Sequence, residues 1–204
     1  MKKLFVFAVA MIASTPALAE GLYVGGFIGP AAVGSSDLRA PAGGGTVGIE
    51  FDTGLKAGVM LGTWVGDHVR IEGEFAFGSV PVASINSTAV DGNVETLFLG
   101  ANVIYDFSGD RFIPHLGAGL GVINIDASDV NDGGAPVFEG GTVTGALQLI
   151  AGVDIPVGSV VLFADYRGMV TPYFDLHQVS TGDPYTMLNG FMTNSVMFGV
   201  KASF

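Results

Sequence analysis

The chain has 204 residues, of which 49% are apolar and only 13% are charged, and it contains 32 glycines and no cysteine. Nineteen acidic residues against eight basic ones give a formal charge of −11, which excludes nucleic acid as an expected partner because the field repels phosphates. Without cysteine there is no disulfide, no thiolate nucleophile and no thiolate metal site. The length fits one domain better than two.

The first 19 residues have the pattern of a secretory signal peptide. A basic start at Lys2 and Lys3 precedes an apolar run over 4–12, and 17–19 has the small-x-small pattern that signal peptidase reads. We expect cleavage after Ala19, which leaves residues 20–204 as the mature domain with six basic residues against 19 acidic ones, a formal charge of −13. The apolar run is too short to span a bilayer as a helix, which takes about 18 residues or more.

Alternation of apolar and polar residues at period 2 recurs in eight segments of the mature chain. The predicted strands are 21–29, 51–65, 69–80, 95–107, 112–125, 142–155, 160–170 and 191–204. Their connections alternate between long and short, and the short ones at 66–68, 108–111 and 156–159 have the size of hairpin turns. These features predict an all-β, eight-stranded antiparallel up-and-down transmembrane barrel with its turns on the periplasmic side.

Each strand sorts its side chains into an apolar face and a thin polar face. The alternation alone does not show which face points outward, since a soluble ligand-binding barrel has the same period. Few charges and small residues such as Gly117 and Gly119 on the polar face favour lipid outside and a crowded interior. Aromatic residues beside the short turns favour the same arrangement, and the predicted periplasmic girdle comprises Tyr105, Phe107, Phe112 and Phe204.

The polar face is predicted to fill the lumen. Its charge cluster comprises Lys56, Arg70, Glu72, Glu74, Asp165, Arg167 and Lys201, and its aromatic side chains comprise Trp64, Phe98 and Phe163. Because an eight-stranded barrel is only just wide enough for its own side chains, we expect neutralising ion pairs that largely plug it. A narrow porin-like channel for ions or small solutes is the alternative.

Turn geometry predicts some of the cross-strand pairs. If Val65 faces Val69, then Trp64 lies opposite Arg70, whose guanidinium can contact the indole ring. The same count across the turn at 156–159 places Gln148 opposite Arg167. We expect Arg70 to pair with Glu72 or Glu74, and Arg167 to group with Asp165 and Lys201.

The long connections are predicted to form acidic surface loops. Their acidic residues are Asp37, Glu50, Asp91, Glu95, Asp126, Asp129, Asp132, Glu139, Asp175 and Asp183, and their basic residue is Arg39. Such a rim repels lipopolysaccharide unless Ca²⁺ or Mg²⁺ bridges the two, so divalent cations are expected to mediate that contact. No resident metal or cofactor is predicted, since the run 126–133 lacks the ligand spacing of an EF-hand.

A lipid-modifying enzyme is the least favoured alternative. Asp175, His177 and Ser180 fall within one predicted loop and are the residue types of a hydrolase site. The His-x-Ser spacing associated with lipid A deacylases is absent. We therefore predict no catalytic residue.

Several short segments resemble a known family. They are GLYVGG over 21–26, RIEGEF over 70–75, PHLGAGLG over 114–121, FADYR over 163–167, and the terminal Phe204. The chain resembles the small outer-membrane β-barrels that include opacity-type surface antigens, the membrane domain of outer membrane protein A and the major outer-membrane antigens of α-proteobacteria. The resemblance implies a Gram-negative outer-membrane location and a role in envelope integrity, adhesion or antigen display. It also implies that barrel-assembly machinery recognises the last strand and that the loops contact a host or cell-surface ligand.

Overall fold

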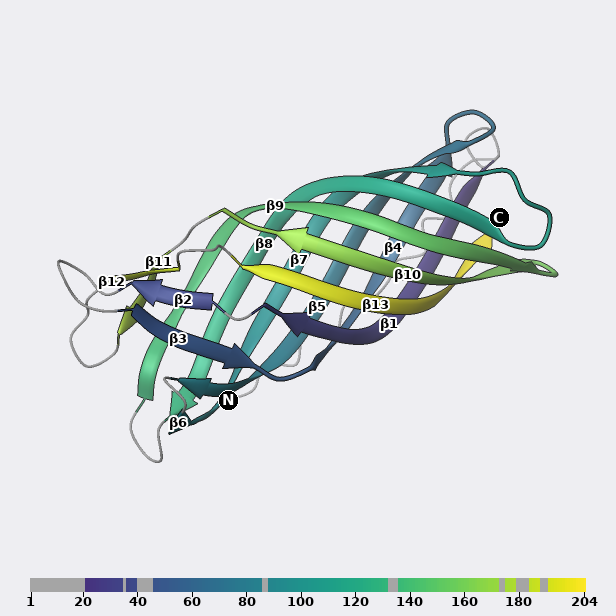
Figure 1. The fold of residues 1–204 in the computed structure, drawn as a ribbon. Helices are drawn as coiled ribbons and strands as arrows, with labels where there is room; N and C mark the ends of the chain where they lie inside the picture. The colour runs from purple at the N-terminus through teal and green to yellow at the C-terminus, as the bar shows by residue number, and fades with distance from the viewer. Residues whose placement is uncertain are drawn as a thin grey trace.

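The computed structural model describes residues 21–34, 36–39, 46–85, 88–131, 136–172, 175–178, 184–187 and 191–204. Eight long strands form a closed antiparallel barrel (Figure 1). They are β1 (Leu22–Val33), β4 (Gly54–Trp64), β5 (Val69–Ile85), β7 (Asp91–Asp106), β8 (Ile113–Asn131), β9 (Pro136–Val157), β10 (Val160–Val170) and β13 (Met192–Ser203). Each pairs with the next along the chain, and β13 closes the ring on β1. The predicted eight-stranded up-and-down barrel is confirmed.

The predicted signal peptide lies outside the described residues. Within the described ranges, no helix has the length and apolar character needed to cross a membrane. The wall of the barrel consists of β-strands throughout these ranges.

Three short turns lie at one end of the barrel, which we call the turn end. At the first turn the Val65 N–H donates to the Val69 carbonyl at 2.7 Å, and Trp64 lies opposite Arg70 as predicted. The carboxyl terminus lies at the same end (Figure 1).

The turn between β9 and β10 is shorter than predicted. Val157 pairs with Val160, so only Gly158 and Ser159 connect the two strands. Gly158 has a φ of 63°, a left-handed conformation that glycine adopts without strain and that two-residue hairpins require. The predicted pairing of Gln148 with Arg167 is therefore wrong by two residues, and Gln148 lies opposite Met169.

The opposite end, which we call the loop end, contains strands where long loops are predicted. Four short strands continue the wall there: β2 (Ser36–Arg39), β3 (Thr46–Phe51), β11 (Asp175–Gln178) and β12 (Pro184–Met187). They join β5 to β9 in the order β5-β3-β2-β12-β11-β9 (Figure 1). A further strand, β6 (Thr88–Ala89), pairs with the end of β5. The predicted loops at 81–94 and 126–141 are wrong, because β5, β7, β8 and β9 occupy most of them.

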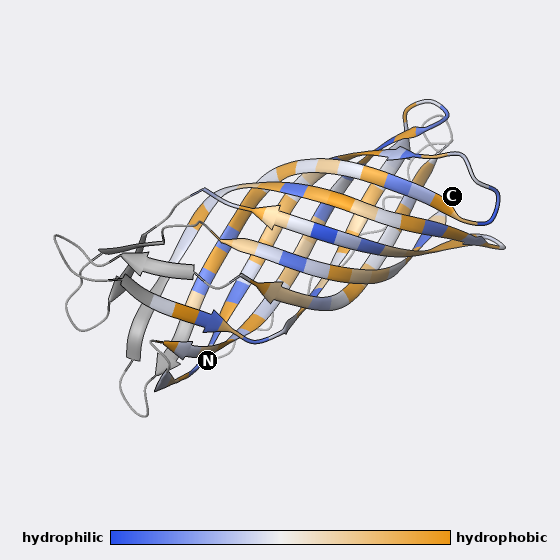
Figure 2. Cartoon of the chain, viewed as in Figure 1, coloured by the Kyte–Doolittle hydropathy of each residue, from blue (hydrophilic) through white to orange (hydrophobic). Residues whose placement is uncertain are grey.

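Apolar side chains cover the outside of the barrel around its middle. Leu99, Leu120 and Leu149 are 58%, 67% and 68% exposed, and they alternate along their strands with inward positions. Figure 2 shows apolar and polar residues alternating along the strands of this region. An outward apolar belt of this kind is typical of a barrel surrounded by lipid.

The polarity of the wall inverts towards the loop end. Along β8 the exposed positions change from Leu120 to Asn124 and Asp126, while the alternate positions Ile123 and Ile125 are buried. The inward positions of β5 change in the same sense, from charged residues near the turn end to Val80 and Val82. The loop end therefore has an apolar interior and a polar exterior, as a barrel standing in water has.

Candidate functional site

The predicted charge cluster lies inside the half of the barrel nearest the turns. Its members are each at most 8% exposed: Lys56, Arg70, Glu72, Glu74, Asp165, Arg167 and Lys201. Every second residue of a strand points to the same face, so β4, β5, β10 and β13 direct these side chains into the lumen. Asp106, His115 and Asp154, from β7, β8 and β9, join them at no more than 4% exposure.

Arg70 is the centre of one group of ion pairs. Its Nη1 donates to Oδ2 of Asp154 at 2.7 Å. Its Nε lies 3.4 Å from Oε1 of Glu72, and its Nη2 lies 3.4 Å from Oδ1 of Asp106. Its guanidinium carbon lies 5.7 Å from the centroid of the Trp64 ring, which is the predicted cation–π contact. Of the two predicted carboxylate partners, Glu72 is the one that Arg70 contacts.

Lys201 joins this first group and not the Arg167 group in which it is predicted. Its ammonium donates to Oδ2 of Asp154 and lies 5.0 Å from the centroid of the Phe163 ring. The Tyr23 hydroxyl donates to Oε1 of Glu72 at 2.5 Å, which attaches β1 to the same group.

Arg167 is the centre of a second group. Its Nη2 and Nε donate to Oδ2 of Asp165 at 2.8 and 3.2 Å, and its Nη1 lies 2.8 Å from Oε2 of Glu74. The guanidinium carbon also lies 4.3 Å from the centroid of the Phe27 ring. Two hydrogen bonds to one carboxylate oxygen and a stacked ring hold this side chain in a single orientation.

Glu74 is shared between two cations and two amides. Its Oε2 accepts hydrogen bonds from Asn102 at 2.9 Å and from Gln148 at 2.8 Å, in addition to the Arg167 contact. Its Oε1 lies 3.7 Å from the ammonium of Lys56. The carboxylate therefore has its charge matched on both oxygens.

His115 connects the two groups. Its Nε2 lies 2.9 Å from Oδ1 of Asp165, and its Nδ1 lies 3.5 Å from Oδ1 of Asp154. Five buried carboxylates face four buried Lys and Arg side chains in the described part of the chain, so the network is neutral to within one charge before His115 is counted. An arrangement of this kind fills a narrow interior and satisfies most of its charges.

The predicted lumen aromatics occupy two different environments. Phe98 and Phe163 are 1% and 4% exposed and lie inside the barrel. Trp64 is 39% exposed, because it is the last residue of β4 and lies at the mouth of the turn end. Its predicted role in narrowing the lumen is therefore wrong, although it does cover Arg70.

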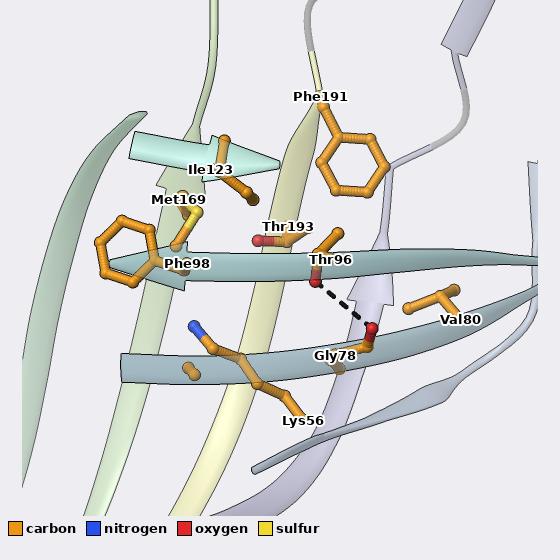
Figure 3. Close-up of a pocket in the computed structure, with 11 residues that line it drawn as sticks. Lys56, Gly78, Val80, Thr96, Phe98, Ile123, Met169, Phe191 and Thr193 are labelled. Carbon is orange, nitrogen blue, oxygen red and sulfur yellow. Dashed lines mark hydrogen bonds between the residues drawn. The ribbon is translucent and has the colours of Figure 1, made fainter. Parts of the chain in front are cut away.

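A small cavity separates the charged half of the lumen from an apolar half. Lys56 lines it together with Phe98, Ile123, Met169 and Phe191. Its volume of about 20 Å³ is enough for one or two water molecules. Figure 3 shows Lys56 extending into this space, with its ammonium 5.6 Å from the centroid of the Phe98 ring.

Beyond the cavity, towards the loop end, the interior is an apolar core. Its buried residues include Val33, Ile49, Val80, Val82, Val90, Val94, Ile125 and Phe191. Sequence reasoning missed this core. The available signal was the change of face along β8, where apolar residues move from even to odd positions.

The predicted girdle residues lie on the outside of the turn end. Tyr105, Phe107, Phe112 and Phe204 are between 43% and 62% exposed. The rings of Tyr105 and Phe107 meet edge to face with centroids 5.1 Å apart, and His68 lies 5.7 Å from Tyr105. Aromatic rings at this level are typical of a membrane–water interface.

The acidic rim is described in part. Glu50, Asp91, Glu95 and Asp126 are exposed near the loop end. The side chains of Asp37, Arg39, Asp129, Asp132, Glu139 and Asp183 lie outside the described residues, as do those of the candidate catalytic set Asp175, His177 and Ser180.

The sequence matches a protein family described as "Outer membrane protein beta-barrel domain" over residues 5–204. No curated protein sequence matches the chain. Among solved structures, Neisserial surface protein A has a TM-score of 0.55 and 20% identity, over 90% of this chain and 97% of that one. AlkL in lipid bilayers has a TM-score of 0.60 and 17% identity, over 94% of each chain. The outer membrane protease OmpT from Escherichia coli has a TM-score of 0.51 and 6% identity, over 94% and 99%. At these identities the likenesses show a common fold.

Proposed function

Since the chain belongs to the outer membrane protein β-barrel family, we propose that it serves the Gram-negative outer membrane as a structural and surface-exposed barrel with a plugged lumen. The observation that carries the proposal is the filled interior. Ion pairs occupy the half of the lumen nearest the turns, and an apolar core occupies the half nearest the loop end.

A solute crossing this interior has to break contacts in both halves. It first separates buried pairs such as Arg70 with Asp154 or Arg167 with Glu74. Breaking one buried pair costs about 3–5 kcal/mol, because it leaves an uncompensated charge. The solute then has to enter an apolar core, where an ion loses its hydration without gaining ligands. The plug therefore has two layers with different chemistry.

The loop end supports a role at the cell surface. Its polar exterior, which includes Glu50, Asp91, Glu95 and Asp126, indicates that this part of the barrel stands in water beyond the apolar belt. We propose that these carboxylates contact lipopolysaccharide through divalent cations, or a host or neighbouring cell surface directly. The turn end, with its aromatic girdle, then faces the periplasm. We also propose that assembly machinery recognises β13, which closes the barrel on β1 and precedes the terminal Phe204.

Planar-bilayer recording on the refolded full chain tests the plug. The wild type is expected to show no steady conductance. The double variant Glu74→Ala with Phe191→Ala shortens one side chain in each layer and is expected to conduct. The control, Glu95→Ala with Phe198→Ala, changes the same residue types on the outer surface and is expected to stay closed.

Two results would contradict the proposal. Steady conductance by the wild type would assign the barrel to the alternative class of narrow porin-like channels. Lipid A modification by membranes that contain the protein, abolished by His177→Ala, would make it an enzyme.

A further inference from the structure

Three potential metal ligands meet inside the turn end of the barrel. Asp106 and His115 lie opposite each other at the last paired position of β7 and β8, and Asp154 comes from the neighbouring strand β9. One ligand atom from each side chain lies within 4.8 Å of the other two. The three residues are 3%, 2% and 4% exposed, so bulk water does not satisfy them.

Four polar atoms of these three side chains have no hydrogen bond. They are Nδ1 of His115, Oδ1 of Asp154 and both carboxylate oxygens of Asp106. Buried polar atoms of native proteins nearly always have a partner, and a charged one left unsatisfied is destabilising. Each of the three side chains therefore has at least one buried polar atom that a shared partner would satisfy.

The second nitrogen of His115 faces another carboxylate. Its Nε2 lies 2.9 Å from Oδ1 of Asp165, a carboxylate that Arg167 fixes in place through two hydrogen bonds. An ionised Asp165 can only accept, so it pairs with an N–H at Nε2, and a ring protonated at Nε2 alone has a lone pair at Nδ1. Nδ1 lies 3.5 Å from Oδ1 of Asp154, and in this tautomer the two electron-rich atoms repel each other unless a cation lies between them. A carboxylate on the far nitrogen of a histidine is also the usual support of a metal-bound imidazole.

The neighbouring cations leave the facing atoms available. Arg70 and Lys201 both bind Oδ2 of Asp154, which is the oxygen that points away from His115. Arg70 lies 3.4 Å from one oxygen of Asp106 without a hydrogen bond. Five carboxylates against four Lys and Arg side chains give the described buried residues a formal charge of −1 with His115 neutral, so a divalent ion changes it to +1 and leaves it no farther from zero.

We propose that Asp106, His115 and Asp154 bind a divalent transition-metal ion inside the turn end of the barrel. One imidazole nitrogen and two carboxylates form a donor set that suits Zn²⁺. Two ligands about 2.1 Å from a tetrahedral zinc ion are about 3.4 Å apart, which matches the 3.5 Å between His115 Nδ1 and Asp154 Oδ1. The site goes beyond the structural role proposed above, and its presence does not depend on whether the lumen conducts.

Metal binding by the refolded full chain in detergent tests the proposal. After EDTA treatment, reloading with excess Zn²⁺ and dialysis against metal-free buffer, the wild type is expected to retain one equivalent of Zn²⁺ per chain by elemental analysis. His115→Gln and Asp106→Asn are expected to weaken binding by more than about tenfold in calorimetric titration. His68→Gln is the matched control, because the side chain of His68 is exposed and its contact with Asp106 is made by the backbone, which the substitution keeps. Heat-modifiable gel migration establishes that each variant is folded.

A spectroscopic measurement on the wild type makes the test independent of variant folding. Co²⁺ in a site with an imidazole and two carboxylates is expected to give visible absorption bands that Zn²⁺ abolishes by displacement. If the wild type retains no zinc and shows no such bands, the proposal is overturned. A protonated His115 is then the cation that faces Asp154. If His115→Gln and His68→Gln retain equal amounts of zinc, the proposal is also overturned, because the zinc is then bound adventitiously at the surface.

Discussion

Gly152 lies opposite Asp165 in the pairing of β9 with β10, and a Cβ added to Gly152 would lie 2.3 Å from Oδ1 of that carboxylate. The same Cβ would lie 2.6 Å from Nε2 of His115. The hydrogen bond between Asp165 and His115 therefore requires glycine at position 152. This close contact is an example of the crowded lumen that the inward-facing glycines predict.

Gly152→Ala is expected to destabilise the barrel by about 1–3 kcal/mol, the usual cost of overpacking a filled interior. Urea unfolding of the refolded protein in lipid vesicles measures the difference. Gly145→Ala on the same strand is the control, since a Cβ there would meet no atom within 4 Å. Equal midpoints for the two variants would show that the lumen around His115 adapts freely.

Glu74→Gln is expected to destabilise the barrel by about 3–5 kcal/mol, because it leaves Arg167 and Lys56 without the carboxylate they share. The shape of the side chain is kept, so the loss reports charge and not volume. Urea unfolding of the refolded protein measures the change. The same substitution at Glu95, exposed on the outer face of β7, is expected to shift the midpoint little. A midpoint for Glu74→Gln equal to that of Glu95→Gln would mean that the amide replaces the carboxylate without cost.

Most of the barrel could be predicted from the sequence because one physical rule, burial at period 2, acts on every strand within the apolar belt. The rule fails where the belt ends. Past Leu120 on β8 the apolar residues change faces, at Ile123 and Ile125, and the turn-forming residues that follow are typical of loops. Strand pairing continues there because the apolar residues pack inside the barrel and not against lipid.

The inward direction of the charged residues was equally predictable, but their partners were not. Arg70 on β5 bonds Asp154 on β9, and these strands are not neighbours in the barrel. Contacts across a lumen depend on the stagger and tilt of all eight strands, whereas sequence patterns define only adjacent pairs. The predicted grouping of Lys201 with Arg167 is wrong for the same reason, since Lys201 also contacts Asp154.

The change of polarity along β8 leads to a prediction about where the membrane ends. Leu120→Arg is expected to destabilise the barrel by about 2–4 kcal/mol, because it places a charge near the bilayer midplane. Asn124→Arg lies four residues away on the same face and is expected to cost about 0–1 kcal/mol, because that position lies outside the hydrocarbon. Unfolding in phospholipid vesicles measures both. Similar costs for the two variants would place the belt boundary nearer the loop end than the polarity of the exposed side chains indicates.

The apolar core of the loop end leads to the last prediction. Phe191 is 1% exposed, meets Phe51 edge to face with centroids 6.5 Å apart, and lines the cavity beside Lys56. Phe191→Ala leaves a void that the strands cannot close, and it is expected to cost about 3–5 kcal/mol. Phe198→Ala removes the same ring from the outer surface of β13, where Phe198 is 57% exposed. Lipid chains fill that space, so its cost is expected to be smaller by more than about 1 kcal/mol. Urea unfolding compares the two variants, and equal costs would show that the loop end contributes no packed core to the stability of the barrel.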